Sequence, residues 1–132
     1  MKSDGEYQCT GQLINDFASD LTPYFLTANH CISSGSEASS ATVYWFYQTA
    51  TCEGTAPYYL DTPHSHGTSI VVTSPSSDFS LLMVDGALPT NYPLFWLGWS
   101  AEYHTVGTGV TSLHHPLARP IHEVDGGAVL AA

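Results

Sequence analysis

The sequence predicts an all-β domain made of short antiparallel strands, and three observations support this fold class. Neutral hydroxyl residues are abundant, with 15 Ser and 14 Thr among 132 residues. Aromatic and β-branched residues favour strands, whereas the 11 Gly and 8 Pro favour turns. No segment shows a clear 3.6-residue apolar period, which is the mark of an amphipathic helix.

The first three expected strands are runs of apolar and β-branched residues with turn residues beside them. Cys9–Ile14 is a short run that ends at the turn-forming pair Asn15-Asp16. Tyr24–Ala28 follows Pro23 and has the composition of a buried strand. Ala41–Tyr47 is the densest run of β-branched and aromatic residues in the chain, which makes it the clearest strand.

Two more strands and two weaker candidates follow. Thr68–Thr73 and Phe79–Val84 are apolar runs separated by the turn-forming segment Ser74–Ser77, which predicts an antiparallel hairpin. Leu94–Trp96 and Gly107–Leu113 are shorter or less regular runs that we also expect to be strands.

Ser- and Gly-rich loops are expected at Ser33–Ser40 and along Glu53–Gly67. Strands joined by loops, with no helices between them, indicate a sandwich or a barrel. In Leu117–Ala132 the Ala and Gly content rises and the β pattern is lost. We therefore expect this tail to be frayed.

The charge balance excludes two classes of partner. Only Lys2 and Arg119 are basic against 12 acidic residues, which gives a formal net charge of −10. Two cations cannot neutralise a phosphate backbone or an anionic membrane surface, so no nucleic acid and no membrane is expected as a partner. The longest apolar run is far short of the ~18 residues of a membrane span. The polar start Met1–Glu6 predicts that no signal peptide is present.

His30 is the first candidate for chemistry. It stands just beyond the strand Tyr24–Ala28, and Cys31, which a disulfide could join to Cys9, follows it directly. A histidine held at the end of a rigid strand is suited to act as a general base. The alternative is a surface histidine that follows an edge strand.

Asp78 lies at the start of the strand Phe79–Val84, 48 residues after His30. A carboxylate held there could accept a hydrogen bond from a histidine Nδ1–H and fix the tautomer of the ring. The alternative is a turn residue that caps the preceding loop.

His64 and His66 are the remaining candidates for a site. Their spacing places both rings on one face of a strand, where they could bind Zn²⁺ or Cu²⁺ with Asp61 nearby. A solvated loop is the alternative that we favour, so no metal and no cofactor is expected. Trp45, Trp96 and Trp99 are expected in the core.

Six segments together are similar to the trypsin-like serine endopeptidases. His30 lies in Thr-Ala-Asn-His-Cys, which resembles the family motif Thr-Ala-x-His-Cys, and Asp78 lies in an element like Asp-[Phe/Ile]-x-Leu-Leu. Four further segments narrow the resemblance to the bacterial lysyl endopeptidase branch: Cys9–Asn15, Val43–Gln48, Leu94–Trp99 and His114–Pro116. The resemblance covers residues 3–116, in order.

The resemblance implies an antiparallel β-barrel and a Ser-His-Asp triad. Residues 1–90 would form the N-terminal barrel with the triad's His30 and Asp78, and residues 91–116 the crossover and first strand of a second barrel. Residues 117–132 stay unassigned. The substrates would be proteins or peptides, cleaved after Lys, and the enzyme would be secreted.

The nucleophile is missing from this pattern. Ser80, Ser100 and Ser112 follow Asp78, but none lies in a Gly-x-Ser-Gly segment that could expose Oγ and supply an oxyanion hole. The resemblance therefore implies a protease fragment that is inactive alone. The alternative is a non-catalytic pseudo-protease or binding module on a half-barrel scaffold.

The odd number of cysteines agrees with an incomplete copy. In the lysyl endopeptidase branch the cysteine that matches Cys52 pairs with one upstream of anything present here. The resemblance therefore implies a disulfide between Cys9 and Cys31 and leaves Cys52 as a free thiol.

Overall fold

The largest sheet contains the strands that lead to both candidate residues. The computed structural model describes residues 2–3, 7–51, 54–115 and 122–128. Its first four-stranded sheet has the order β3 (Gln12–Ile14), β4 (Tyr24–Thr27), β8 (Phe79–Val84) and β7 (Thr68–Ser74). All neighbouring strands of this sheet are antiparallel. A bulge between Ile70 and Val72 shifts the register of β7 against β8.

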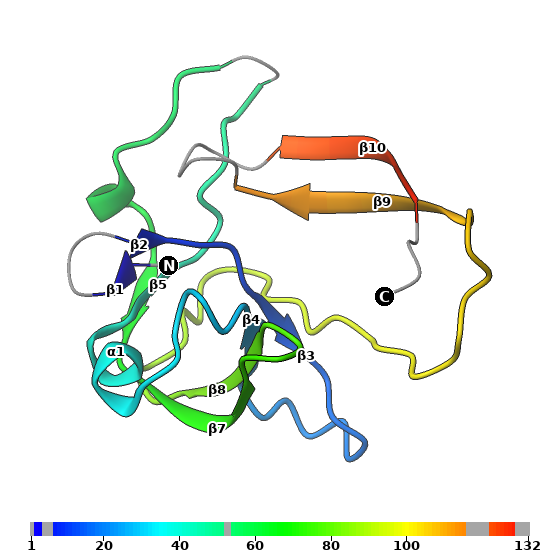
Figure 1. Cartoon of the computed structure of the whole chain (residues 1–132). Helices are drawn as coiled ribbons and strands as arrows, with labels where there is room; N and C mark the ends of the chain where they lie inside the picture. The colour runs from blue at the N-terminus through cyan, green and yellow to red at the C-terminus, as the bar shows by residue number, and fades with distance from the viewer. Residues whose placement is uncertain (1, 4–6, 52–53, 116–121, 129–132) are drawn as a thin grey trace.

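A second four-stranded sheet and a separate hairpin complete the β structure (Figure 1). The second sheet has the order β2 (Tyr7–Gln8), β1 (Lys2–Ser3), β5 (Thr42–Tyr44) and β6 (His64–His66). The hairpin pairs β9 (Gly109–His114) with β10 (His122–Ala128). The expected β class with antiparallel sheets is confirmed, although the fold is mostly β and not all-β, and the described residues form no closed barrel.

One expected loop is wrong, because Gly35–Ser40 forms the short helix α1. Its N-cap is a capping box: the Glu37 backbone N–H donates to Ser34 Oγ, and the Ser34 backbone N–H donates to Glu37 Oε2 at 2.9 Å. The hydrogen bond from the Ser33 backbone N–H, followed by those from the Ser34 and Ser33 hydroxyls and the Ser34 backbone N–H, lowers the pKa of the Glu37 carboxyl.

Several boundaries also differ from the expectation. Within the expected loop at Glu53–Gly67 lie the 3₁₀ turn η1 (Tyr59–Asp61) and strand β6. The expected strand at Leu94–Trp96 is absent; instead Leu97 forms a single parallel bridge with Ile14. The tail is not wholly irregular, because β10 pairs with β9 through backbone hydrogen bonds that need no apolar pattern.

The apolar core lies between the two four-stranded sheets and α1. Its buried members are Leu13, Phe25, Ile32, Ala38, Ala41, Val43, Trp45, Leu82 and Val84. Phe25 and Trp45 meet edge to face, with ring centroids 6.0 Å apart. The Trp45 indole donates to Ser65 Oγ, which in turn donates to the Ala87 carbonyl, so the polar atoms inside the core are paired. Trp96 packs against this core, as expected. Trp99 is exposed, so the expectation that it lies in the core is wrong.

No helix of the described residues is both long enough and apolar enough to cross a membrane.

The two sheets approach each other closely where β8 ends. Gly86 lies against the backbone of His66 in β6, and a Cβ at position 86 would stand 2.5 Å from the His66 carbonyl oxygen. A backbone atom cannot swing aside as a flexible side chain does. A larger residue at position 86 would therefore force the sheets apart.

We expect Gly86→Ala to lower the free energy of unfolding by about 1–3 kcal/mol, the usual cost of overpacking. Urea denaturation followed by tryptophan fluorescence measures this change. Gly98→Ala is the matched control, because a Cβ at position 98 meets nothing within 4 Å. Equal stability of the two variants would contradict the close approach.

Candidate functional site

The register of β4 against β8 places His30 beside Asp78. Thr27 is paired with Ser80 at the last position of the antiparallel ladder. His30 follows Thr27 by three residues and Asp78 precedes Ser80 by two, so both leave the same end of the strand pair. This single strand pairing thus brings together two residues that are 48 positions apart in the sequence.

Asp78 contacts His30 through both of its carboxylate oxygens. The His30 backbone N–H donates to Oδ1 at 2.9 Å. His30 Nδ1 lies 2.7 Å from Oδ2. The predicted proximity of the two side chains is confirmed, whereas their catalytic roles stay a prediction. Because one carboxylate binds both the backbone and the ring of His30, it fixes the position and the orientation of the imidazole.

The charge state of Asp78 determines the tautomer of the ring. The hydrogen bond from the His30 backbone N–H, followed by that from the His30 side chain, lowers the pKa of the Asp78 carboxyl. An ionised carboxylate only accepts hydrogen bonds, so Nδ1 must carry the proton. In the neutral ring the lone pair is then left on Nε2, the atom that a general base uses.

Both alternatives for these residues describe part of what is seen. The His30 side chain is 71% exposed, as expected for a surface histidine, but it has a charged partner. Asp78 does lie in the turn before β8, with a left-handed φ of 47°, a conformation that Asp tolerates better than most residues. Its carboxylate binds His30 instead of capping the loop.

A hydroxyl network below the site was missed in the sequence. The Asn29 side-chain amide donates to Thr73 Oγ1 at 2.8 Å, and Thr73 Oγ1 is 2.6 Å from Ser80 Oγ. Ser80 Oγ donates to the Ile32 carbonyl at 2.6 Å. The network joins the turn that carries His30 to β7 and β8. A polar residue inside an apolar strand, Ser80 in Phe79–Val84, was the available signal.

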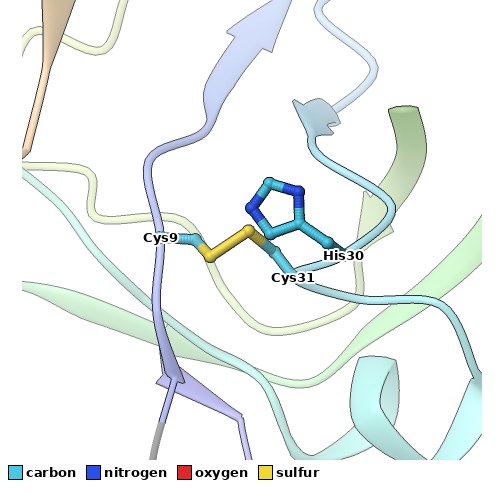
Figure 2. Close-up of side chains that lie close together, drawn as sticks. All are labelled: Cys9, His30 and Cys31. Carbon is cyan, nitrogen blue, oxygen red and sulfur yellow. A yellow bond between two sulfur atoms is a disulfide. The ribbon is translucent and has the colours of Figure 1, made fainter. Parts of the chain in front are cut away.

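A disulfide between Cys9 and Cys31 anchors the other side of the turn. Its two Cα atoms are 6.2 Å apart, and the half-cystines are 22 residues apart in the sequence. Figure 2 shows the imidazole of His30 beside this disulfide. Cys52, expected to be a free thiol, lies outside the described residues.

None of the serines that follow Asp78, namely Ser80, Ser100 and Ser112, has the surroundings of a nucleophile. Ser80 is fully buried and its Oγ is used in the network above. Ser100 Oγ accepts the Glu102 backbone N–H at 3.2 Å. Ser112 is exposed on β9, where no glycine-flanked turn surrounds it. A groove of about 600 Å³ has both Asp78 and Ser112 in its wall.

His64 and His66 lie on one exposed face of β6, as their spacing predicts. Thr42 Oγ1 lies 3.0 Å from Nδ1 of His66, and the Thr62 carbonyl 3.1 Å from Nδ1 of His64. In the described part of the chain, neither ring joins a group of three metal-ligating side chains. The segment is a strand instead of the solvated loop that we favoured.

Comparisons with known proteins agree with the resemblance seen in the sequence. Residues 1–119 match the family model described as "Lysyl endopeptidase, C-terminal domain". The chain is also 32% identical over 114 residues to the lysyl endopeptidase of Pseudomonas aeruginosa. This alignment covers 85% of the chain and 24% of that protein, so the chain spans about a quarter of the relative's length.

We expect the Asp78 carboxyl to titrate below 3.8, its ordinary pKa. In His30→Ala its pKa should rise only part of the way back, because the backbone N–H donor, the larger cause, remains. Carbon-detected NMR titration measures both values. Since the folded-state pKa is depressed, Asp78 adds stability above pH ~4 that is lost as the pH falls through the lowered value. A normal pKa in the wild-type chain would contradict the paired carboxylate.

Replacing both half-cystines, as in Cys9→Ala with Cys31→Ala, should destabilise the chain by about 3 kcal/mol, the chain-entropy value for a loop of this size. Urea denaturation under non-reducing conditions measures the loss. Cys52→Ala is the control, and we expect it to change little. Peptide mapping that joined Cys52 to either of the other two would contradict the pairing.

Proposed function

Because the chain belongs to the lysyl endopeptidase C-terminal domain family, we propose that it carries the general base and the orienting carboxylate of a secreted serine endopeptidase. His30 is the base and Asp78 its partner. The observation that carries the proposal is the double contact of the Asp78 carboxylate with the backbone and the ring of His30.

The chemistry follows from this geometry. Nε2 of His30 removes the proton from a serine hydroxyl as the oxygen attacks the scissile carbonyl, and it returns the proton to the leaving amine. The Asp78 carboxylate stabilises the imidazolium formed in between, because it already accepts the Nδ1 proton. The exposure of His30 leaves the ring open to a nucleophile from outside this chain.

The serine is the part that this sequence does not supply. It contains no Gly-x-Ser-Gly segment, and the oxyanion hole that such a turn provides goes with it. In our proposal, the serine and the oxyanion hole both come from another part of the protease. The Pseudomonas relative has room for such a part, because the alignment with this chain covers only 24% of it. The chain alone is therefore inactive.

The fold supports a corresponding division of the chain. In our proposal the two four-stranded sheets within residues 1–90 form the N-terminal barrel of a trypsin-like pair. Residues 91–116 form the crossover and the start of the second barrel. In support, the segment from Phe95 to Leu113 exposes apolar side chains that a second barrel would cover: Phe95, Trp99, Tyr103, Val106, Val110 and Leu113. Residues 117–132 remain unassigned, apart from the pairing of β10 with β9.

The proposed substrate rests on the Pseudomonas relative, and the proposed location on the disulfide. Cleavage of proteins or peptides after Lys is proposed from the name of the Pseudomonas protein. Secretion is proposed because the Cys9–Cys31 disulfide requires an oxidising compartment. We propose no cofactor for the reaction.

A pseudo-protease or binding module is the second candidate. The absence of a nucleophile motif from the sequence is the observation that favours it. The same scaffold would then bind a partner without cleaving it, and the His30–Asp78 pair would be structural.

A chimera separates the two candidates. This chain replaces the aligned segment of the Pseudomonas lysyl endopeptidase, and hydrolysis of a lysyl ester is measured together with fluorophosphonate labelling. We expect turnover that falls by about a millionfold in His30→Ala and by about ten-thousandfold in Asp78→Asn, as for the members of a triad. The isolated chain should show neither turnover nor labelling.

His64→Ala in the chimera is the matched control and should retain full turnover, because His64 lies on β6, away from the pair. Full activity of the His30→Ala chimera would refute the assigned base. A chimera with native circular dichroism but no turnover would favour the binding module. Labelling of Ser80, Ser100 or Ser112 in the isolated chain would reveal a nucleophile within it.

A further inference from the structure

Three potential metal ligands meet at the turn after β4. The sulfur atoms of Cys9 and Cys31 and a ring nitrogen of His30 all lie within 4.8 Å of one another (Figure 2). Of the side chains that the structure describes, this is the one group of three such ligands. With Cys9 and Cys31 joined in a disulfide, the sulfur atoms are not available as thiolates.

The spacing suits a tetrahedral metal ion once the sulfurs are separated. Bonds of about 2.3 Å to sulfur and about 2.0 Å to nitrogen place the ligand atoms of a zinc ion roughly 3.5–3.8 Å from one another. The His30 ring nitrogen lies within 4.8 Å of both sulfur atoms, at most about 1 Å beyond that range, whereas the two bonded sulfurs lie closer together than that range and must move apart. Opening the disulfide therefore requires side-chain rotation more than backbone movement.

Asp78 prepares the ring for this role. Its carboxylate accepts the Nδ1 proton of His30, which leaves the lone pair on Nε2. Carboxylates hydrogen-bonded to the second nitrogen of a histidine ligand are a common feature of zinc sites, where they orient the ring and increase its basicity. This second observation is independent of the cysteine spacing.

We infer that reduction converts this disulfide and His30 into a Cys₂His site for Zn²⁺. A phosphine or dithiol reductant supplies two electrons, the Cys9–Cys31 sulfur–sulfur bond breaks, and two protons give two thiols. With a phosphine, the reductant becomes the phosphine oxide, and water supplies its oxygen and the two protons; with a dithiol, the reductant becomes a disulfide and supplies the two protons itself. Binding of Zn²⁺ then displaces the two thiol protons, and neutral His30 contributes its lone pair without losing a proton.

The site has a consequence for the proposed base. An imidazole whose lone pair is bound to a metal cannot accept a proton, so the reduced, metal-bound chain would lack the base that the oxidised chain holds ready. The inference goes beyond the proposed function, because metal binding does not require that His30 be catalytic.

The test measures metal binding to the reduced chain, in a Cys52→Ser background that removes the third thiol. After reduction with a water-soluble phosphine, Co²⁺ is added as a spectroscopic probe, and Zn²⁺ affinity follows from competition with a chromophoric chelator. We expect one ion per chain with a thiolate-to-cobalt charge-transfer band, and no such band in the oxidised chain.

Variants identify the ligands. His30→Ala and Cys9→Ser should each weaken Zn²⁺ binding by more than tenfold, and Asp78→Asn by about 10–100-fold, as expected for a group that orients a ligand. His64→Ala is the matched control and should bind as the parent does, because His64 lies outside the cluster. An unchanged affinity in His30→Ala, or a band in the oxidised chain, would overturn the inference.

Circular dichroism and a thermal melt guard against a reduced chain that has simply unfolded. Zn²⁺ should raise the midpoint of the melt of the reduced parent and leave that of reduced His30→Ala unchanged. If the reduced chain stays unfolded with Zn²⁺ present, the inference is wrong, since the site depends on the fold. Hydrolysis by the oxidised chimera is unaffected by this outcome, so the two proposals fail separately.

Discussion

The antiparallel pairing of β4 with β8 is the constraint on which the rest of the molecule depends. It buries Phe25 and Leu82 in one core and ends at the pair Thr27 and Ser80. The candidate site residues His30 and Asp78 lie just beyond that end. A shift of the register by one residue would turn the apolar side chains of one strand out of the core and carry Asp78 away from His30. The same strand register therefore determines which side chains are buried in the core and where the site residues lie.

The site is exposed, but its support is buried. His30 and Asp78 are open to solvent, where a single pair of polar side chains contributes little to stability. Below them Ser80 is fully buried and links β8 to the Ile32 carbonyl, and the disulfide holds Cys31 on the opposite side. The exposed His30 and Asp78 are thus supported by the buried Ser80 and by the disulfide. Such rigid support is what holds the side chains of a functional site in place.

The sequence predicted the parts that depend on short patterns. The strands around Phe25 and Leu82 and the juxtaposition of His30 with Asp78 follow from local runs and motifs, and the Cys9–Cys31 pair from the family resemblance. It failed where backbone pairing decides the outcome alone: β6 and β10 carry no strong apolar alternation, yet each is held by a partner strand. The helix after Ser34 was overlooked although Ser34 and Glu37 have the spacing of a capping box. Side-chain networks such as Asn29–Thr73–Ser80 join three elements: a polar residue inside an apolar strand points to Ser80, but its partners on the other elements follow only from the fold.

The bulge in β7 bears on the behaviour of the chain at high concentration. β7 is the last strand of its sheet, and Val71 and Val72 on it are about half exposed. A long, regular edge of this kind is a template for strands of other molecules and so for aggregation. The extra residue between Ile70 and Val72 interrupts the regular spacing of backbone groups along that edge. The bulge and the repulsion expected from a net charge of −10 both oppose edge-to-edge aggregation of the domain.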